Sequence, residues 1–225
     1  MLQSEHQRLA YLKALGIDVW LLRGAADPEP DQAMVEPVTD GIEWSELRSN
    51  VAQCSRCPLH QSRTQTVFGV GNPDADWMII GEAPGAEEDR RGEPFVGRAG
   101  KLLNEMLHAV GQERYSVFIA NILKCRPPDN RDPKPDEVAE CRDYLEQQIA
   151  RVQPKIILAV GRIAAQHLLD SHETVGKMRG ILHHLGEIPL IVTYHPAYLL
   201  RSPRQKRKAW DDLCLAKQTL AESAA

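Results

Sequence analysis

A short apolar run followed by a glycine-containing turn reads Trp77-Met78-Ile79-Ile80-Gly81-Glu82-Ala83-Pro84-Gly85. A continuous apolar run that ends at a glycine turn is typical of a strand buried on both faces. Such strands occur in parallel sheets, because crossover helices cover both faces of those sheets. The stretch therefore predicts a strand over Trp77–Ile80 with a turn at its carboxyl end.

The same pattern recurs along the chain, with helical segments between the apolar runs. Further strands are predicted at Val117–Ala120, Lys155–Val160 and Leu190–Thr193, and helices at Trp44–Gln53, Gly100–Val110, Pro135–Arg151, Arg162–Leu169 and Pro203–Leu220. Strands that alternate with helices form crossover units. The predicted fold class is α/β: a three-layer sandwich with a central, mostly parallel four-stranded sheet, plus an N-terminal helical appendage.

The composition is that of a folded protein without a membrane segment. Hydrophobic residues make up 43% of the 225 residues and charged residues 26%, which excludes a disordered, collagen-like or coiled-coil chain. No stretch approaches the roughly 18 apolar residues that a membrane-spanning helix needs, and the N-terminus lacks a secretory signal pattern. We therefore expect a cytoplasmic monomer with no membrane contact.

Charge and proline content divide the chain into three parts. Residues 1–45 carry three Lys or Arg against eight Asp or Glu, a net charge of −5, whereas the whole chain carries −4. The spacing of leucines predicts a helical appendage over residues 1–24, and residues 25–41 form an acidic, proline-rich linker. The folded body is expected over 42–225, and residues 1–41 are a candidate segment for binding a protein partner.

Four of the five cysteines form a candidate metal site. They are Cys54 and Cys57, which form a C-x-x-C pair, and Cys125 and Cys141. Cytosolic thiols stay reduced, so ligation of metal is favoured over disulfides, and four thiolates suit either zinc or an iron–sulfur cluster. The spacing does not choose between these metals, and small buried cysteines are the alternative. Cys214, between two leucines of the last predicted helix, is expected to be a buried, inert thiol.

Acidic residues and glycines crowd the segment 81–97, which follows the first predicted strand. Its carboxylates belong to Glu82, Glu87, Glu88, Asp89 and Glu93. Carboxylates repel phosphate, so this is not a nucleotide phosphate cradle. Its glycines let the backbone approach a ligand, and Phe95 offers a ring for stacking. Asn121 and His195 follow two other predicted strands, and we expect these segments to converge at the carboxyl edge of the sheet.

Three long motifs resemble one known family. They are Gly81-Glu82-Ala83-Pro84-Gly85 continuing to 94–103 (Pro-Phe-Val-Gly-Arg-Ala-Gly-Lys-Leu-Leu), Asn121 with Lys124-Cys125-Arg126-Pro127-Pro128, and His195-Pro196-Ala197-Tyr198-Leu199-Leu200-Arg201. From about residue 50 to 214, the chain resembles the family 4, iron–sulfur uracil-DNA glycosylases. The resemblance implies a DNA-repair hydrolase that flips uracil out of DNA, cleaves its N-glycosidic bond and leaves an abasic site. It also implies that the four cysteines hold a structural 4Fe-4S cluster.

The resemblance assigns a role to each residue of the pocket. Phe95 is implied to stack on the uracil, Asn121 to read its edge, and His195 to donate to its O2 oxygen. Glu82 lies between Gly81 and Ala83 at the motif position that handles the attacking water. Ala83 stands where the best known relatives carry an aspartate, so the candidates to activate the water are Glu82 and Glu88.

The segment after His195 is implied to contact DNA. Leu199 is placed as the apolar wedge that fills the gap left by the flipped base, and phosphate contacts are expected from Arg201, Arg204, Lys206, Arg207 and Lys208. The alternative to an enzyme is a non-catalytic, metal-stabilised α/β module that binds DNA or a replication partner. Release of free uracil by an iron-containing protein separates the two.

Overall fold

A single sheet organises the part of the chain that the computed structural model describes, residues 43–223. Its strand order is β1-β3-β2-β4-β6-β5. The four inner strands are parallel to one another: β2 (Trp77–Gly81), β3 (Phe118–Asn121), β4 (Ile156–Val160) and β6 (Ile188–Thr193). Two short strands, β1 (Val70–Gly71) and β5 (Leu182–Leu185), pair antiparallel at the two edges.

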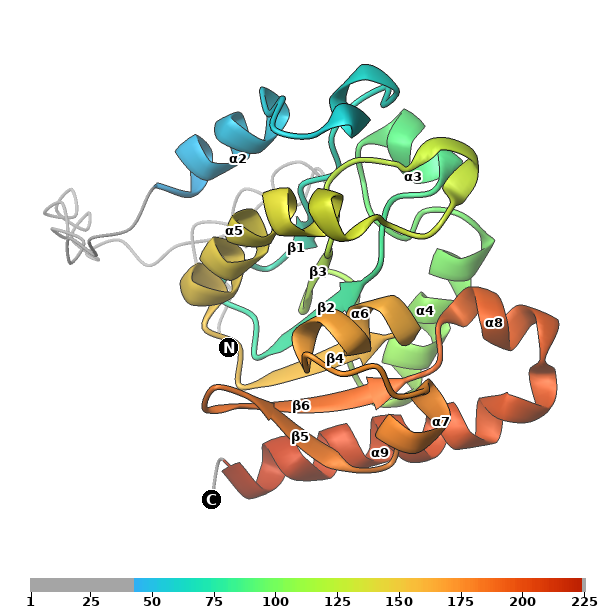
Figure 1. The fold of residues 1–225 in the computed structure, drawn as a ribbon. Helices are drawn as coiled ribbons and strands as arrows, with labels where there is room; N and C mark the ends of the chain where they lie inside the picture. Colours follow the sequence, from blue (N-terminus) through green and yellow to red (C-terminus); the bar gives the residue numbers. More distant parts are fainter. Residues whose placement is uncertain (1–42, 224–225) are drawn as a thin grey trace, which may run out of the picture. The chain divides into compact units, whose positions relative to one another are not determined.

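Helices cover both faces of the sheet (Figure 1). One face packs on α2 (Trp44–Ala52), α5 (Pro135–Val152), α6 (Arg162–Leu168) and α7 (Val175–Met178), and the other on α4 (Arg98–Ala109), α8 (Pro196–Arg201) and α9 (Lys206–Ser223). A further short helix, α3 (Ala86–Arg91), follows β2, and 3-10 turns occupy Pro58–Gln61, Pro128–Asn130 and Pro203–Gln205. The predicted three-layer sandwich is thus confirmed.

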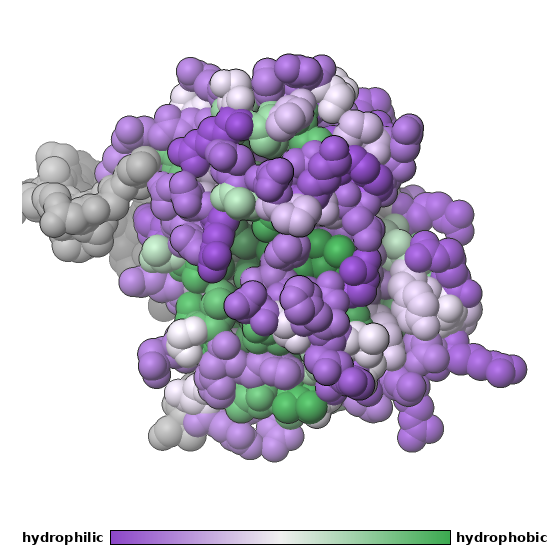
Figure 2. Space-filling view, in the orientation of Figure 1, coloured by the Kyte–Doolittle hydropathy of each residue, from purple (hydrophilic) through white to green (hydrophobic). Residues whose placement is uncertain are grey.

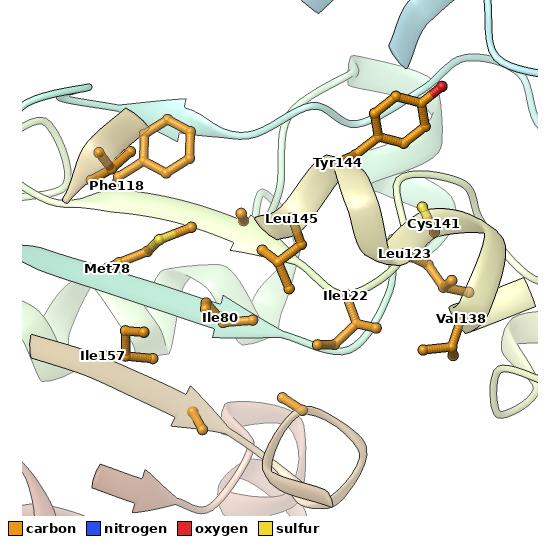
Figure 3. Packing of buried hydrophobic residues seen from close by; sticks show 14 of the residues in the cluster. Met78, Ile80, Phe118, Ile122, Leu123, Val138, Cys141, Tyr144, Leu145 and Ile157 are labelled. Carbon is orange, nitrogen blue, oxygen red and sulfur yellow. The ribbon is translucent and has the colours of Figure 1, made fainter. Parts of the chain in front are cut away.

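Successive side chains along each strand point to opposite faces of the sheet, so each strand contributes to the core on both faces. In β2, Met78 and Ile80 point into the core under α5, whereas Trp77 and Ile79 point into the core under α4 and α9. Figure 3 shows Met78 and Ile80 of β2 near Leu145 of α5, with Ile157 on the neighbouring strand β4. A strand buried on both faces has to be apolar at every position, which explains the continuous apolar runs of the sequence.

The structure corrects the predicted number of strands and adds short helices that were not predicted. The sheet has six strands rather than four, because the two edge strands are short and β5 carries two histidines in the pattern Leu-His-His-Leu. The short helices α3, α7 and α8 were not predicted, since four to six residues are too few for a helical period to show. The predicted appendage 1–24 and linker 25–41 lie outside the described residues.

The surface shown in Figure 2 is mostly hydrophilic, and apolar atoms show through mainly in its middle. Among the helices that the structure describes, none combines the length and the apolar content needed to cross a membrane.

Candidate active site

A cleft of about 760 Å³ lies at the carboxyl ends of the parallel strands. It draws residues from segments that are far apart in the sequence, and its lining includes Glu82, Ala83, Glu88, Phe95, Asn121, Asn130, Arg162, Tyr194, His195, Tyr198 and Arg201. The predicted convergence of the segments after three strands is therefore confirmed. The topology explains it, because parallel strands end at the same edge of the sheet.

Asn121, the last residue of β3, lies on the floor of the cleft. Its side chain is only 2% exposed, and its Oδ1 atom has no hydrogen-bond partner within residues 43–223. Gly81 pairs with it across the sheet, and a Cβ atom on Gly81 would lie 2.5 Å from that Oδ1 and 2.6 Å from the Phe95 ring. A buried amide oxygen without a partner is costly, so this position is prepared for a donor from a ligand.

Phe95 forms one wall of the cleft in a constrained backbone conformation. Its φ of +52° is unusual for a residue with a side chain. Arg114 donates to the carbonyl oxygens of Pro94 (2.5 Å) and Phe95 (3.3 Å). A Cβ atom on Gly100 would lie 1.7 Å from the Phe95 carbonyl oxygen, so only glycine fits there. Strain held by surrounding contacts at a cleft is typical of a functional position.

His195 lies beside Phe95, with ring centroids 5.6 Å apart and an angle of 29° between the planes. It caps α8, and its Nδ1 accepts the backbone N–H of Ala197 at 3.1 Å. Burial lowers the pKa of His195 to about 4, helped by the charge of Arg201 and opposed by that of Glu88. The imidazole is therefore neutral at pH 7. Because Nδ1 accepts, the proton is on Nε2, which is a donor.

The two candidate carboxylates are in different situations. Burial raises the pKa of Glu82 to about 7; the charge of Asp132 adds to the rise and that of Arg162 opposes it. Glu88 instead accepts the backbone N–H groups of Val96 (2.9 Å) and Gly97 (3.0 Å) through Oε1. Glu88 therefore holds the loop that carries Phe95, and Glu82 is the carboxylate tuned to exchange a proton near neutral pH.

Leu199 does not lie where the wedge was predicted. Its side chain is 1% exposed and packs in the core with the helices on its face of the sheet, so it cannot enter a DNA duplex. Its neighbours Tyr198 and Leu200 are each 37% exposed. The reason is the short helix α8, in which consecutive side chains are turned by about 100°.

The predicted phosphate-binding residues are all on the surface. Arg201 lines the cleft. The other four are exposed and do not line it: Arg204, Lys206, Arg207 and Lys208. They follow α8 along the chain and open α9. Together they form a basic run that begins at the cleft with Arg201 and continues along the chain into the start of α9.

The four candidate ligand cysteines gather between α5 and the segment 54–63. Cys125 and Cys141 are buried, and Cys54 and Cys57 are partly exposed. Their sulfurs receive donors: Arg63 Nη1 lies 3.0 Å from the Cys125 Sγ, and the Lys124 N–H lies 3.3 Å from the Cys141 Sγ. Donors of this kind stabilise thiolates, so the donor set fits a group with metal-bound sulfur.

Cys214 is exposed, so the prediction of a buried thiol there is wrong. The neighbouring Leu213 is buried. On a helix such as α9, the next residue is turned about 100° away from a core-facing position. Two flanking leucines therefore did not indicate burial.

Several residues of the cleft were not predicted as site residues. Arg162 begins α6 directly after β4 and pairs with Asp132 at 2.5 Å, and Asn130 lies in a left-handed turn. Outside the cleft, Asp89 is buried and accepts the backbone N–H of Thr64 at 2.9 Å, which ties α3 to the segment near the cysteines. The position of Arg162 at a strand end was the one signal that could have identified it.

Comparison with known sequences agrees with this geometry. The sequence model described as the Uracil DNA glycosylase superfamily matches residues 68–214, and the chain belongs to that superfamily. A type-4 uracil-DNA glycosylase of Archaeoglobus fulgidus is 42% identical over 182 residues, which cover 75% of this chain and 92% of the relative. One from Thermotoga maritima is 44% identical over 175 residues, covering 76% and 91%. Within the superfamily, the chain belongs to the type-4 branch.

Proposed function

We propose that the protein is a uracil-DNA glycosylase that accepts a uracil flipped out of DNA and hydrolyses its N-glycosidic bond. The observation that carries this proposal is the buried Asn121 Oδ1, which has no partner among the described residues and faces a cleft walled by Phe95. The N3–H group of uracil is a donor that suits this acceptor, and the amide nitrogen can donate to uracil O4. The products are free uracil and an abasic site.

The charges around the cleft suit the transition state of this reaction. As the bond between C1′ and N1 breaks, its electron pair leaves with the base and the sugar becomes positive. The Nε2–H of His195 is available to the negative charge that develops on O2. Water then adds its oxygen to C1′ and gives its proton to Glu82, whose raised pKa matches this exchange.

The surface beside the cleft supports binding to DNA. Leu200 and Tyr198 are the exposed apolar side chains of α8, and we assign the wedge to Leu200 in place of Leu199. The basic run of Arg201 to Lys208 suits the phosphates on either side of a flipped base.

The four cysteines are proposed to hold a 4Fe-4S cluster. Within residues 43–223, no three Cys, His, Asp or Glu side chains lie close enough to hold one metal ion. A single zinc draws four sulfurs to about 2.3 Å from one centre, whereas in a cluster each thiolate binds a different iron. The donors to the sulfurs of Cys125 and Cys141, together with the likeness to type-4 enzymes, support assigning Cys54, Cys57, Cys125 and Cys141 to a cluster, which would stabilise the loops that carry them.

The direct test is the release of free uracil from a uracil-containing oligonucleotide, single-stranded and paired with guanine. We expect free uracil and an alkali-labile strand from both. DNA binding without release would instead support a non-catalytic module.

Replacing Cys141 with alanine is expected to abolish most iron binding and to lower the melting temperature. Metal binding contributes to folding stability when the site exists only in the folded state. Iron content and thermal melting check this, with the exposed Cys214→Ala as the matched control. Unchanged iron and melting temperature in Cys141→Ala would remove it from the ligand set.

The rate of uracil release is expected to rise with pH through about 7 and then to level off. Glu82 has to be ionised to accept the proton of water, and its pKa is raised to about 7. His195, with its pKa lowered to about 4, stays neutral over this range. Single-turnover rates between pH 5 and 9 measure the profile.

Two variants test whether Glu82 is the group that causes this pH dependence. Glu82→Gln should lose the rise, and Asp132→Asn should shift it to lower pH, because the Asp132 charge raises the pKa of Glu82. An unchanged profile in Glu82→Gln would show that another group accepts the proton.

A further inference from the structure

Lys124 is a fully buried lysine that joins the end of β3 to α5. Its side chain is 1% exposed, and its Nζ donates to the backbone carbonyl of Asn121 at 2.8 Å and to Gln148 Oε1 at 2.6 Å. Gln148 is itself buried and donates to the carbonyl of Phe68 at 2.8 Å. The ammonium therefore holds the main chain of the residue that lies on the floor of the cleft.

The same residue contacts the cysteine site. The N–H of Lys124 donates to the Cys141 Sγ at 3.3 Å, and Cys125 is its neighbour in the chain. Lys124 is thus one residue with two sets of contacts. Its backbone N–H donates to the candidate ligand Cys141, and its side chain donates to the backbone carbonyl of Asn121.

The buried charge of Lys124 needs an anion. Burying an unpaired ammonium is expensive, and a buried charge is normally compensated by an opposite one. Among the ion pairs formed by residues 43–223, none includes Lys124, and its two oxygen partners are neutral. Two groups beside it can become anionic: Cys141, whose Sγ accepts the Lys124 N–H, and Cys125, the next residue in the chain. Metal binding makes both sulfurs thiolates and so supplies the counter-charge.

We propose that Lys124 is a positioning residue that couples the cysteine site to base recognition. Its ammonium compensates the thiolates and, in the same position, fixes the carbonyl of Asn121 so that the amide of that residue stays directed into the cleft. The recognition half of this proposal rests on the proposed function. The charge half rests only on the cysteine site.

The key variant is Lys124→Met, which keeps the shape of the side chain and removes its charge and its donor. Lys155→Met is the control, since Lys155 is exposed and its ion pair with Asp76 lies next to the beginning of β4, away from the cleft. Single-turnover release of uracil should fall by about 10- to 100-fold in Lys124→Met and stay unchanged in the control.

A double-mutant cycle with Asn121→Ala shows whether Lys124 acts through Asn121. In that background, adding Lys124→Met should lower the rate by less than about twofold, because the group that it positions is already gone. Equal losses in both backgrounds would overturn the positioning role.

The reduction potential of the cluster tests the charge half without any activity measurement. Removing a nearby positive charge stabilises the more oxidised cluster, so Lys124→Met should shift the potential to more negative values. Gln148→Glu is a second variant that neutralises the ammonium and keeps its contact with Asn121, and it should shift the potential in the same direction. Unchanged potentials in the variants that fold would overturn the charge role. A wild-type protein that releases no uracil would instead refute the proposed function and leave the potential to decide the charge half.

Discussion

Replacing His195 with alanine is expected to slow the release of uracil by about a hundred- to a thousandfold, the usual effect of removing one preorganised donor to a developing negative charge. The donor is the Nε2–H, because Nδ1 accepts from the N–H of Ala197. The effect should be confined to the chemical step, since a neutral imidazole adds little attraction for the DNA phosphates. Single-turnover rates and the affinity for uracil-containing DNA measure the two contributions separately.

The exposed His172 provides the matched control, because it does not line the cleft. His172→Ala should leave both the rate and the affinity unchanged. If His195→Ala weakens binding as much as it slows release, His195 positions the DNA rather than stabilising the leaving base.

Asn121→Asp is expected to lose most activity on uracil and to gain a weak activity on cytosine that increases toward acidic pH. The asparagine amide can accept from the N3–H of uracil and donate to O4, whereas cytosine presents an amine donor and an unprotonated N3. Each buried mismatched group costs about 1–3 kcal/mol, so two such clashes supply much of the discrimination. A protonated aspartic acid satisfies both groups of cytosine, which explains the expected dependence on acid.

Release of both bases under single-turnover conditions between pH 5 and 8 checks this expectation. Asn72→Asp is the control, since Asn72 pairs with Val117 just before β3 begins, at the opposite end of the sheet from the cleft. Undiminished release of uracil by Asn121→Asp would remove Asn121 from base recognition.

Much of the fold was predictable because both faces of the inner strands are buried. The apolar runs around Ile79 and Leu158 have no polar interruption, and this pattern has few explanations other than a parallel sheet. The edge strand β5 carries no such signal, since its residues alternate between exposed and half-buried positions. An edge strand depends on its partner β6 more than on its own sequence.

The cleft was predictable in outline, but the orientation of individual side chains was not. The order of strands and turns places Asn121 and His195 at the same edge of the sheet. The sequence does not reveal that a helix begins at Pro196, and so it does not show that Leu199 is turned into the core while Leu200 is turned outward. The burial of Lys124 could not be predicted from the sequence either. Lysine is rarely buried unless a partner compensates its charge, and the sequence does not show which groups lie around it.

The position of free uracil in a crystal of the protein tests the pocket most directly. We expect the base to lie against the Phe95 ring, with its N3–H donating to Asn121 Oδ1 and its O2 oxygen within hydrogen-bond distance of His195 Nε2. Uracil bound elsewhere, or bound in the cleft with the Asn121 oxygen still lacking a partner, would contradict the assignment of this site to uracil.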